Sequence, residues 1–213
     1  MKILFLNPNS SIPVTARIRE AVSGLGSDSL SIVVGRCPGS PTEIVTAEDE
    51  LRAGIQAVET LKKEDFDAAV IGCFADPGLR SARECIIKPV VGLFESSVYF
   101  ARLKAHRYAI IASGEESEIE PWLGTLRMMG EEQNVHSFEC IGAGVEGALH
   151  VSDDRILERI RKVKSEGAGA AILGCAAFAG RGRRLSEAVG IPVIDGVEES
   201  IRLAEMLVRY GRY

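Results

Sequence analysis

The chain has 213 residues, enough for one large domain or two small lobes around a buried core. Its formal net charge is −5 and it has no basic stripe, which gives no reason to expect nucleic acid or an anionic membrane as a partner. The first apolar run stops after about five residues at Asn7-Pro8-Asn9, too short for a signal peptide or a membrane span. We therefore expect a cytoplasmic protein.

The cysteines and histidines show no spacing typical of a disulfide framework or a metal site. The five cysteines are odd in number and include no CxxC, and the three histidines are scattered. In a cytoplasmic protein such cysteines are expected to be reduced. Without ligand-like spacing of cysteine and histidine, we expect no bound metal.

Apolar runs alternate with amphipathic stretches through the first half of the chain. Strands are predicted at residues 3–7, 29–34, 67–72 and 89–94. The helix after the first strand should be capped by Ser10 or Ser11. Residues 35–45 are predicted to form a Pro/Gly-rich loop long enough to be a lid or a substrate loop. A helix is predicted at 47–63, with an apolar stripe made of Leu51, Ile55, Val58 and Leu61.

The second half repeats this organisation. Strands are predicted at residues 107–113, 134–142, 169–174 and 191–195. A helix is predicted at 152–167, with Ser152 as its N-cap. Four strand–helix units in each half predict an α/β fold of two similar lobes, each a mostly parallel four-stranded sheet flanked by helices. We expect the first lobe at 1–95, completed by 196–213, the second at 96–195, and a site in the cleft between them.

Two stretches of sequence correspond closely between the halves. "DAAVIGCFADPG" (67–78) and "AGAAILGCAAFAG" (168–180) each contain an apolar strand, then Gly-Cys, then small residues. Cys73 and Cys175 are 102 residues apart, close to half the chain. A second pair of stretches, 88–103 and 191–207, matches in the same register. Such an internal repeat predicts two lobes related by a pseudo-two-fold axis.

The repeat gives Cys73 and Cys175 a chemical meaning. If the lobes face each other, the two thiols face each other across a small molecule. Each precedes a turn that should open a helix, whose N-terminus favours a thiolate. One thiolate can remove a proton from an acidic carbon while the opposite thiol returns one, which inverts that carbon without metal, flavin or pyridoxal phosphate. The other three cysteines are expected to be small apolar residues of the core.

The sequence resembles the hydantoin and allantoin racemases of the aspartate/glutamate racemase superfamily. The resemblance covers nearly the whole chain and includes "LNPNSS", "GCFADPGL", "PVVG", "LGCA" and "IPVIDGVEESIRLAE". It implies cofactor-independent racemisation of 5-substituted hydantoins, or of allantoin, between two α/β lobes. It also implies a homo-oligomer, whose interface the sequence does not identify.

The resemblance suggests roles for individual residues. Cys73 and Cys175 match the catalytic thiols, and the remaining candidates surround them. Pro8 and Asn9 match a loop that closes on the substrate, although Asn9 could be only a helix cap. Phe74 and Ala176 follow the thiols, where backbone N–H groups could hold an enolate oxygen. Two further candidates for the substrate site are Glu95, which could instead be a helix-start carboxylate, and Ser113.

Some positions depart from the family pattern and leave the substrate open. Ala112-Ser113 stands where many members have two threonines, and "CAAFAG" replaces Cys-Ala-Gly-Met. Glutamate or aspartate racemase is less favoured, because "NPN", "CFA" and "CAA" differ from the motifs of those enzymes. Arylmalonate decarboxylases use one thiol, whereas this chain keeps two. Maleate isomerase, a non-catalytic small-ligand binder and a redox thiol protein remain as alternatives.

Overall fold

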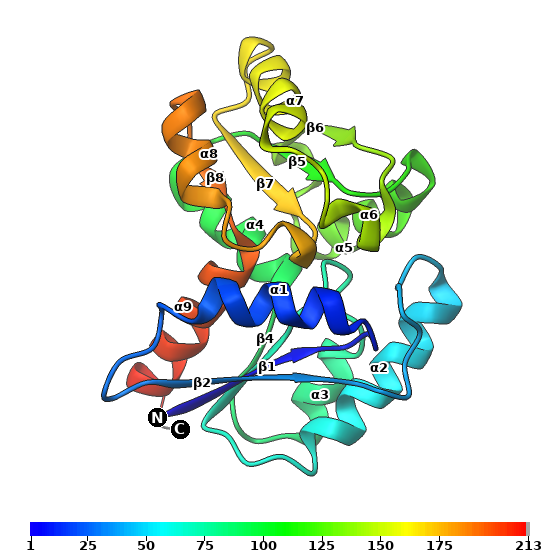
Figure 1. Cartoon of the computed structure of the whole chain (residues 1–213), viewed down its shortest axis with the longest axis vertical. Coiled ribbons are helices and arrows are strands. Elements are labelled where there is room, and N and C mark those ends of the chain that lie inside the picture. Colours follow the sequence, from blue (N-terminus) through cyan, green and yellow to red (C-terminus); the bar gives the residue numbers. More distant parts are fainter. Residues whose placement is uncertain (212–213) are drawn as a thin grey trace.

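The computed structural model describes residues 1–211 (Figure 1), so the last two residues of the segment 196–213 lie outside it. Within the described residues, eight strands form two four-stranded parallel sheets. The first sheet has the order β2-β1-β3-β4, from β1 (Lys2–Asn7), β2 (Ser31–Arg36), β3 (Ala68–Ile71) and β4 (Val90–Gly92). The second has the order β6-β5-β7-β8, from β5 (Tyr108–Ala112), β6 (Val135–Cys140), β7 (Ala170–Gly174) and β8 (Val193–Ile194). The identical strand order confirms the predicted two-lobed α/β fold.

Helices connect successive strands and cover both sheets (Figure 1). The α-helices are α1 (Ile12–Val22), α2 (Ala47–Leu61), α3 (Leu79–Cys85), α4 (Leu93–Lys104), α5 (Ile119–Met129), α6 (Gly144–Ala148), α7 (Asp153–Ser165), α8 (Gly182–Val189) and α9 (Gly196–Tyr210). Short 3-10 helices are η1 (Glu116–Glu118), η2 (Glu132–Asn134) and η3 (Ala176–Phe178). The described chain contains no helix with the length and apolar character needed to span a membrane.

Side-chain caps fix where two helices of the two lobes begin. The Ser11 hydroxyl accepts a hydrogen bond from the Val14 N–H at the start of α1. The Ser152 hydroxyl accepts one from the Arg155 N–H at the start of α7. Both bonds satisfy backbone donors that a helix leaves unpaired in its first turn. The predicted caps are therefore confirmed.

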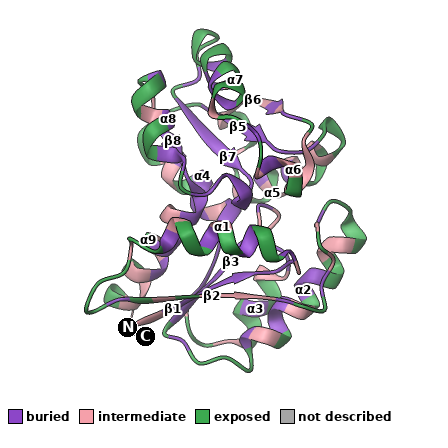
Figure 2. Cartoon of the chain, in the orientation of Figure 1, coloured by how far each residue is buried: buried purple, intermediate pink, exposed green. Residues whose placement is uncertain are grey.

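The inner strands β1, β3, β5 and β7 are the buried centre of the two lobes (Figure 2). On β1, Ile3 and Phe5 face a core that continues into the second lobe, whereas Leu4 and Leu6 face a smaller core with α2. This alternation follows from the two-residue period of a strand. Because the larger core is shared by both lobes, their relative position is set by packed apolar side chains.

The helices α4 and α9 pack against each other between the two sheets. A side chain on Gly196 would overlap the Ser97 hydroxyl, so the close approach of these helices requires a glycine there. The helix α9 also contacts β1, β3 and β4 of the first sheet. The lobe boundaries near residues 95 and 195 stay a prediction.

The predicted apolar stripe of α2 is wrong in part. Leu51 and Ile55 are 66% and 55% exposed, whereas Val58 and Leu61 are buried. The small residues Ala53, Gly54 and Ala57 complete the buried face. The helix packs closely against α3 through these small residues, which turns the larger side chains Leu51 and Ile55 toward an open groove.

Candidate active site

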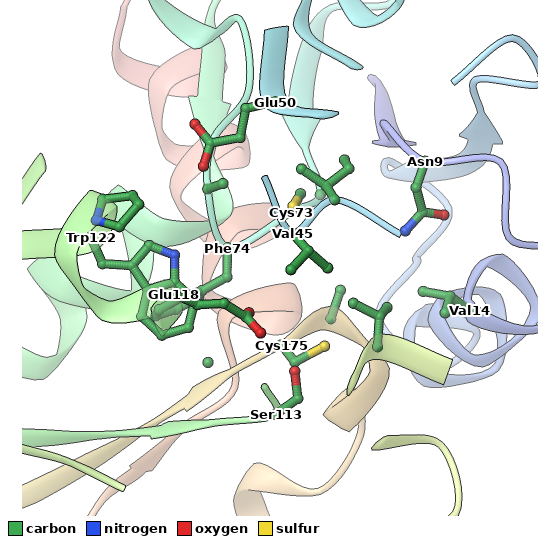
Figure 3. Close-up of a pocket in the computed structure, with 17 residues that line it drawn as sticks. Asn9, Val14, Val45, Glu50, Cys73, Phe74, Ser113, Glu118, Trp122 and Cys175 are labelled. Carbon is green, nitrogen blue, oxygen red and sulfur yellow. The ribbon is translucent and has the colours of Figure 1, made fainter. Parts of the chain in front are cut away.

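A cavity lies between the two lobes, at the carboxyl ends of the central strands of both sheets. Cys73 follows β3 of the first sheet, and Cys175 follows β7 of the second. Figure 3 shows the two thiols on opposite sides of the cavity. Its lining residues come from both lobes and combine apolar and polar side chains, which suits one small molecule. In parallel α/β sheets the carboxyl ends of strands are the usual place for a ligand.

Most of the residues suggested by the sequence come together here. Six of them line the cavity: Asn9, Cys73, Phe74, Ser113, Cys175 and Ala176. Pro8 precedes Asn9 in the same loop but does not line the cavity. The Phe74 ring also packs edge-on against Trp122, with centroids 5.2 Å apart, so Phe74 serves both the cavity wall and an aromatic cluster.

Glu95 is not brought to this cavity. It lies in the first turn of α4, where its carboxylate accepts a hydrogen bond from the Gly92 N–H at 3.2 Å. The Arg83 guanidinium donates to the same carboxylate at 3.0 Å. These contacts face the separate groove beside α2. The position fits the alternative given for Glu95, a carboxylate at a helix start.

The buried surroundings of Cys73 disfavour its thiolate. Gly72, just before it, leaves room for the Phe5 ring, which a side chain at position 72 would overlap. Desolvation, together with smaller effects of the negative charges of Cys175, Asp76 and Glu50, raises the pKa of Cys73 to about 12. A hydrogen bond from the Ala75 N–H works in the opposite direction. Cys73 is therefore better suited to hold a proton than to lack one.

Cys175 has a side-chain donor that Cys73 lacks. Desolvation raises the pKa of Cys175, and the Ser113 hydroxyl and the Ala177 N–H lower it through hydrogen bonds. Figure 3 shows the Ser113 oxygen next to Cys175. In the second sheet, Ala112 of β5 pairs with Gly174, and Ser113 is the next residue after Ala112. The same register in the first sheet puts Pro8 at the corresponding position, and proline has no hydroxyl. This difference favours Cys175 as the thiolate of the pair.

Asn9 is oriented by the loop that contains it. Its Oδ1 accepts hydrogen bonds from Asn7 Nδ2 at 2.8 Å and from the Ser11 N–H at 2.9 Å. Because the oxygen is occupied by two donors, the Nδ2 group is the one turned toward the cavity (Figure 3). Asn9 therefore offers an N–H donor to a bound carbonyl oxygen.

The loop before α2 covers the cavity and is held by the opposite lobe. Ile44 and Val45 line the cavity. The Glu43 carboxylate accepts hydrogen bonds from the N–H groups of Val145 and Glu146, at 3.2 and 3.3 Å, at the start of α6. The structure thus places the predicted lid loop over the site, with a carboxylate joining it to the second lobe.

Sequence reasoning missed several residues of the cavity wall. Glu50 comes from α2, Glu118 from the end of η1 and Trp122 from α5. None belongs to the internal repeat or follows a strand directly, so no pattern in the sequence indicated them. Glu118 directly precedes α5, and this place in the sequence says nothing about where its side chain points.

Comparison with known proteins agrees with this arrangement. The family model described as "Asp/Glu/Hydantoin racemase" matches residues 3–204. The hydantoin racemase of Paenarthrobacter aurescens is 32% identical, over 99% of this chain and 92% of that protein. The hydantoin racemase of Pseudomonas sp. (strain NS671) is also 32% identical, over 100% of this chain and 88% of that protein.

A solved structure with the same fold is the allantoin racemase of Klebsiella pneumoniae. It superposes with a TM-score of 0.92 at 28% identity, covering 99% of this chain and 89% of that one. The superposition covers both sheets. With the family model matching nearly the whole chain, the protein belongs to the Asp/Glu/hydantoin racemase family.

Proposed function

We propose that the protein racemises a 5-substituted hydantoin, with allantoin as one candidate, by proton transfer between Cys73 and Cys175. The observation that carries this proposal is the position of the two thiols, which line one cavity from opposite lobes. The relatives named hydantoin racemase and the allantoin racemase structure support the substrate class.

The chemistry needs only the two thiols and hydrogen-bond donors. The Cys175 thiolate removes the proton from C5 of the hydantoin, and the electron pair moves onto the adjacent carbonyl as an enolate. The Cys73 thiol then delivers its proton to the other face of C5, and the electrons return to form the inverted C–H bond. The enzyme is left with the thiolate on Cys73, ready for the opposite enantiomer.

Donors near the thiols can stabilise the enolate oxygen. The backbone N–H groups of Phe74 and Ala176 directly follow the two thiols, and Asn9 offers its amide Nδ2. Fixed donors in a site screened from water stabilise developing charge more strongly than water does. In this proposal the lid residues Ile44 and Val45 supply that screening.

The test is racemisation of single enantiomers without added cofactor. Optical rotation of several 5-substituted hydantoins and of allantoin is followed in deuterated buffer, with NMR detection of deuterium at C5. We expect loss of rotation together with deuterium incorporation, faster than in buffer alone. Inactivity of the folded, reduced protein on every substrate would overturn the proposal and favour isomerisation of a maleate-like substrate.

Serine variants test the two thiols separately. Cys73→Ser and Cys175→Ser should each abolish racemisation, while hydrogen exchange at C5 of one enantiomer can survive through the remaining thiol. Cys85→Ser is the matched control, because Cys85 is exposed on α3 and does not line the cavity. Full racemase activity in both active-site variants would refute the assignment.

A further inference from the structure

Two carboxylates stand on the cavity wall beside the thiols. Glu50 and Glu118 line the same cavity as the two thiols, and their charges raise the pKa of Cys73 and of Cys175, respectively. Both side chains are partly buried, and desolvation raises the pKa of each. Figure 3 shows both side chains at the cavity wall.

No positive side chain balances these acids among the described residues. Glu118 accepts a hydrogen bond from the Glu115 N–H at 3.0 Å, and neither Glu118 nor Glu50 takes part in a salt bridge within residues 1–211. The described lining of the cavity contains no lysine, arginine or histidine. Partly desolvated carboxylates without a positive partner favour a ligand that brings positive charge or N–H donors.

The rest of the cavity wall also favours a ligand with positive charge or N–H donors over one with a carboxylate. Val14, Ile44, Val45 and Val145 are apolar and give a carboxylate no donor from their side chains, and Trp122 adds only its indole N–H. A negatively charged substituent would be repelled by Glu50 and Glu118 in surroundings that screen charge less than water does. An amide, ureido, amino or guanidino group could instead donate to one of them.

We propose that Glu50 and Glu118 select hydantoins whose C5 substituent carries N–H donors or a positive charge, and reject those with a carboxylate. The inference rests on the proposed racemase function and specifies its substrate class. Ureido-bearing allantoin and the hydantoins derived from glutamine and lysine fit this class. The hydantoin derived from glutamate does not, although it has nearly the same shape as that derived from glutamine.

The experiment compares kcat/KM for matched hydantoins. The glutamine-derived compound should be racemised about 10- to 100-fold more efficiently than the glutamate-derived one, the range expected for a hydrogen bond to a charged group. Glu50→Gln and Glu118→Gln should each reduce this ratio. A uniform change for all substrates would reflect altered thiol acidity, so the ratio is the readout that isolates substrate selection.

Matched controls remove charges outside the cavity. Glu48→Gln on α2 and Glu116→Gln on η1 change exposed carboxylates that do not line the cavity, and should leave the ratio unchanged. Equal racemisation of the acidic, neutral and basic hydantoins would overturn the inference while leaving the racemase function intact. An unchanged ratio in both cavity variants would also overturn it. Absence of racemisation with every hydantoin would overturn the function and the inference together.

Discussion

Replacing Ser113 by alanine should raise the pKa of Cys175. The Ser113 hydroxyl lowers this pKa by hydrogen bonding to the sulfur, and alanine removes the donor without adding volume. A hydrogen bond to a charged group contributes about 1.5–3 kcal/mol. Since about 1.4 kcal/mol corresponds to one pH unit, the pKa of Cys175 should rise by about one to two pH units.

The rise should appear in kinetics and in direct titration. The lower pH limit of kcat/KM should move upward, and equally for both enantiomers, because their overall equilibrium constant is one. Alkylation by iodoacetamide as a function of pH, measured in a Cys73→Ser background, reports Cys175 alone at the cavity. Ser113→Thr keeps a hydroxyl and is the matched control.

The outcome for Ser113→Ala decides whether the hydroxyl tunes the thiol. An unchanged pKa of Cys175 in a folded protein would refute the reasoning. A fall in activity without a change of pKa would assign Ser113 to substrate contact instead. If the pKa of Cys175 rises in both Ser113→Ala and Ser113→Thr, the shape of the side chain at this position, rather than its hydroxyl, sets that pKa.

Three further substitutions test other parts of the structure. Glu43→Ala removes the acceptor for the first N–H groups of α6, a loss of about 1 kcal/mol. It should therefore raise KM about fivefold and speed hydrogen exchange of the Val145 amide. Unchanged exchange at Val145 would contradict the lid contact. Burial raises the pKa of Asp76 to about 7, above its unfolded value of about 3.9, so its contribution to stability is complete below pH about 4 and lost as the pH rises through about 7. In urea unfolding, the wild-type protein should therefore lose stability relative to Asp76→Asn as the pH rises through that range. A free-energy difference between the two proteins that does not change with pH would contradict this. Glu95→Gln weakens an ion pair in which Arg83 is 45% exposed and Glu95 12% exposed, and glutamine can still accept from the Gly92 N–H, so it should cost about 1 kcal/mol in unfolding and leave kcat unchanged. A large fall in kcat would place Glu95 in catalysis after all.

The sequence by itself determined the architecture and the two central thiols. Apolar runs alternating with amphipathic stretches predicted the strands, and the shared register of two stretches predicted the repeat. Ser11 and Ser152 were predictable because N-capping is a local interaction between a side chain and the next turn. Cys73 and Cys175 were predictable because each closely follows an apolar strand and the internal repeat relates the two strand ends.

Only the tertiary structure decided which other side chains form the cavity wall. Glu50 and Glu118 reach it because of how α2 and η1 pack on different lobes, and Glu95 is kept away by the contacts of α4 with Arg83. The stripe predicted on α2 failed for a similar reason, because small residues form most of its buried face. Helix periodicity indicates that one face is buried, but the choice of face depends on segments distant in sequence. Local pattern thus fixed the positions of the strand ends, and long-range packing decided what surrounds them.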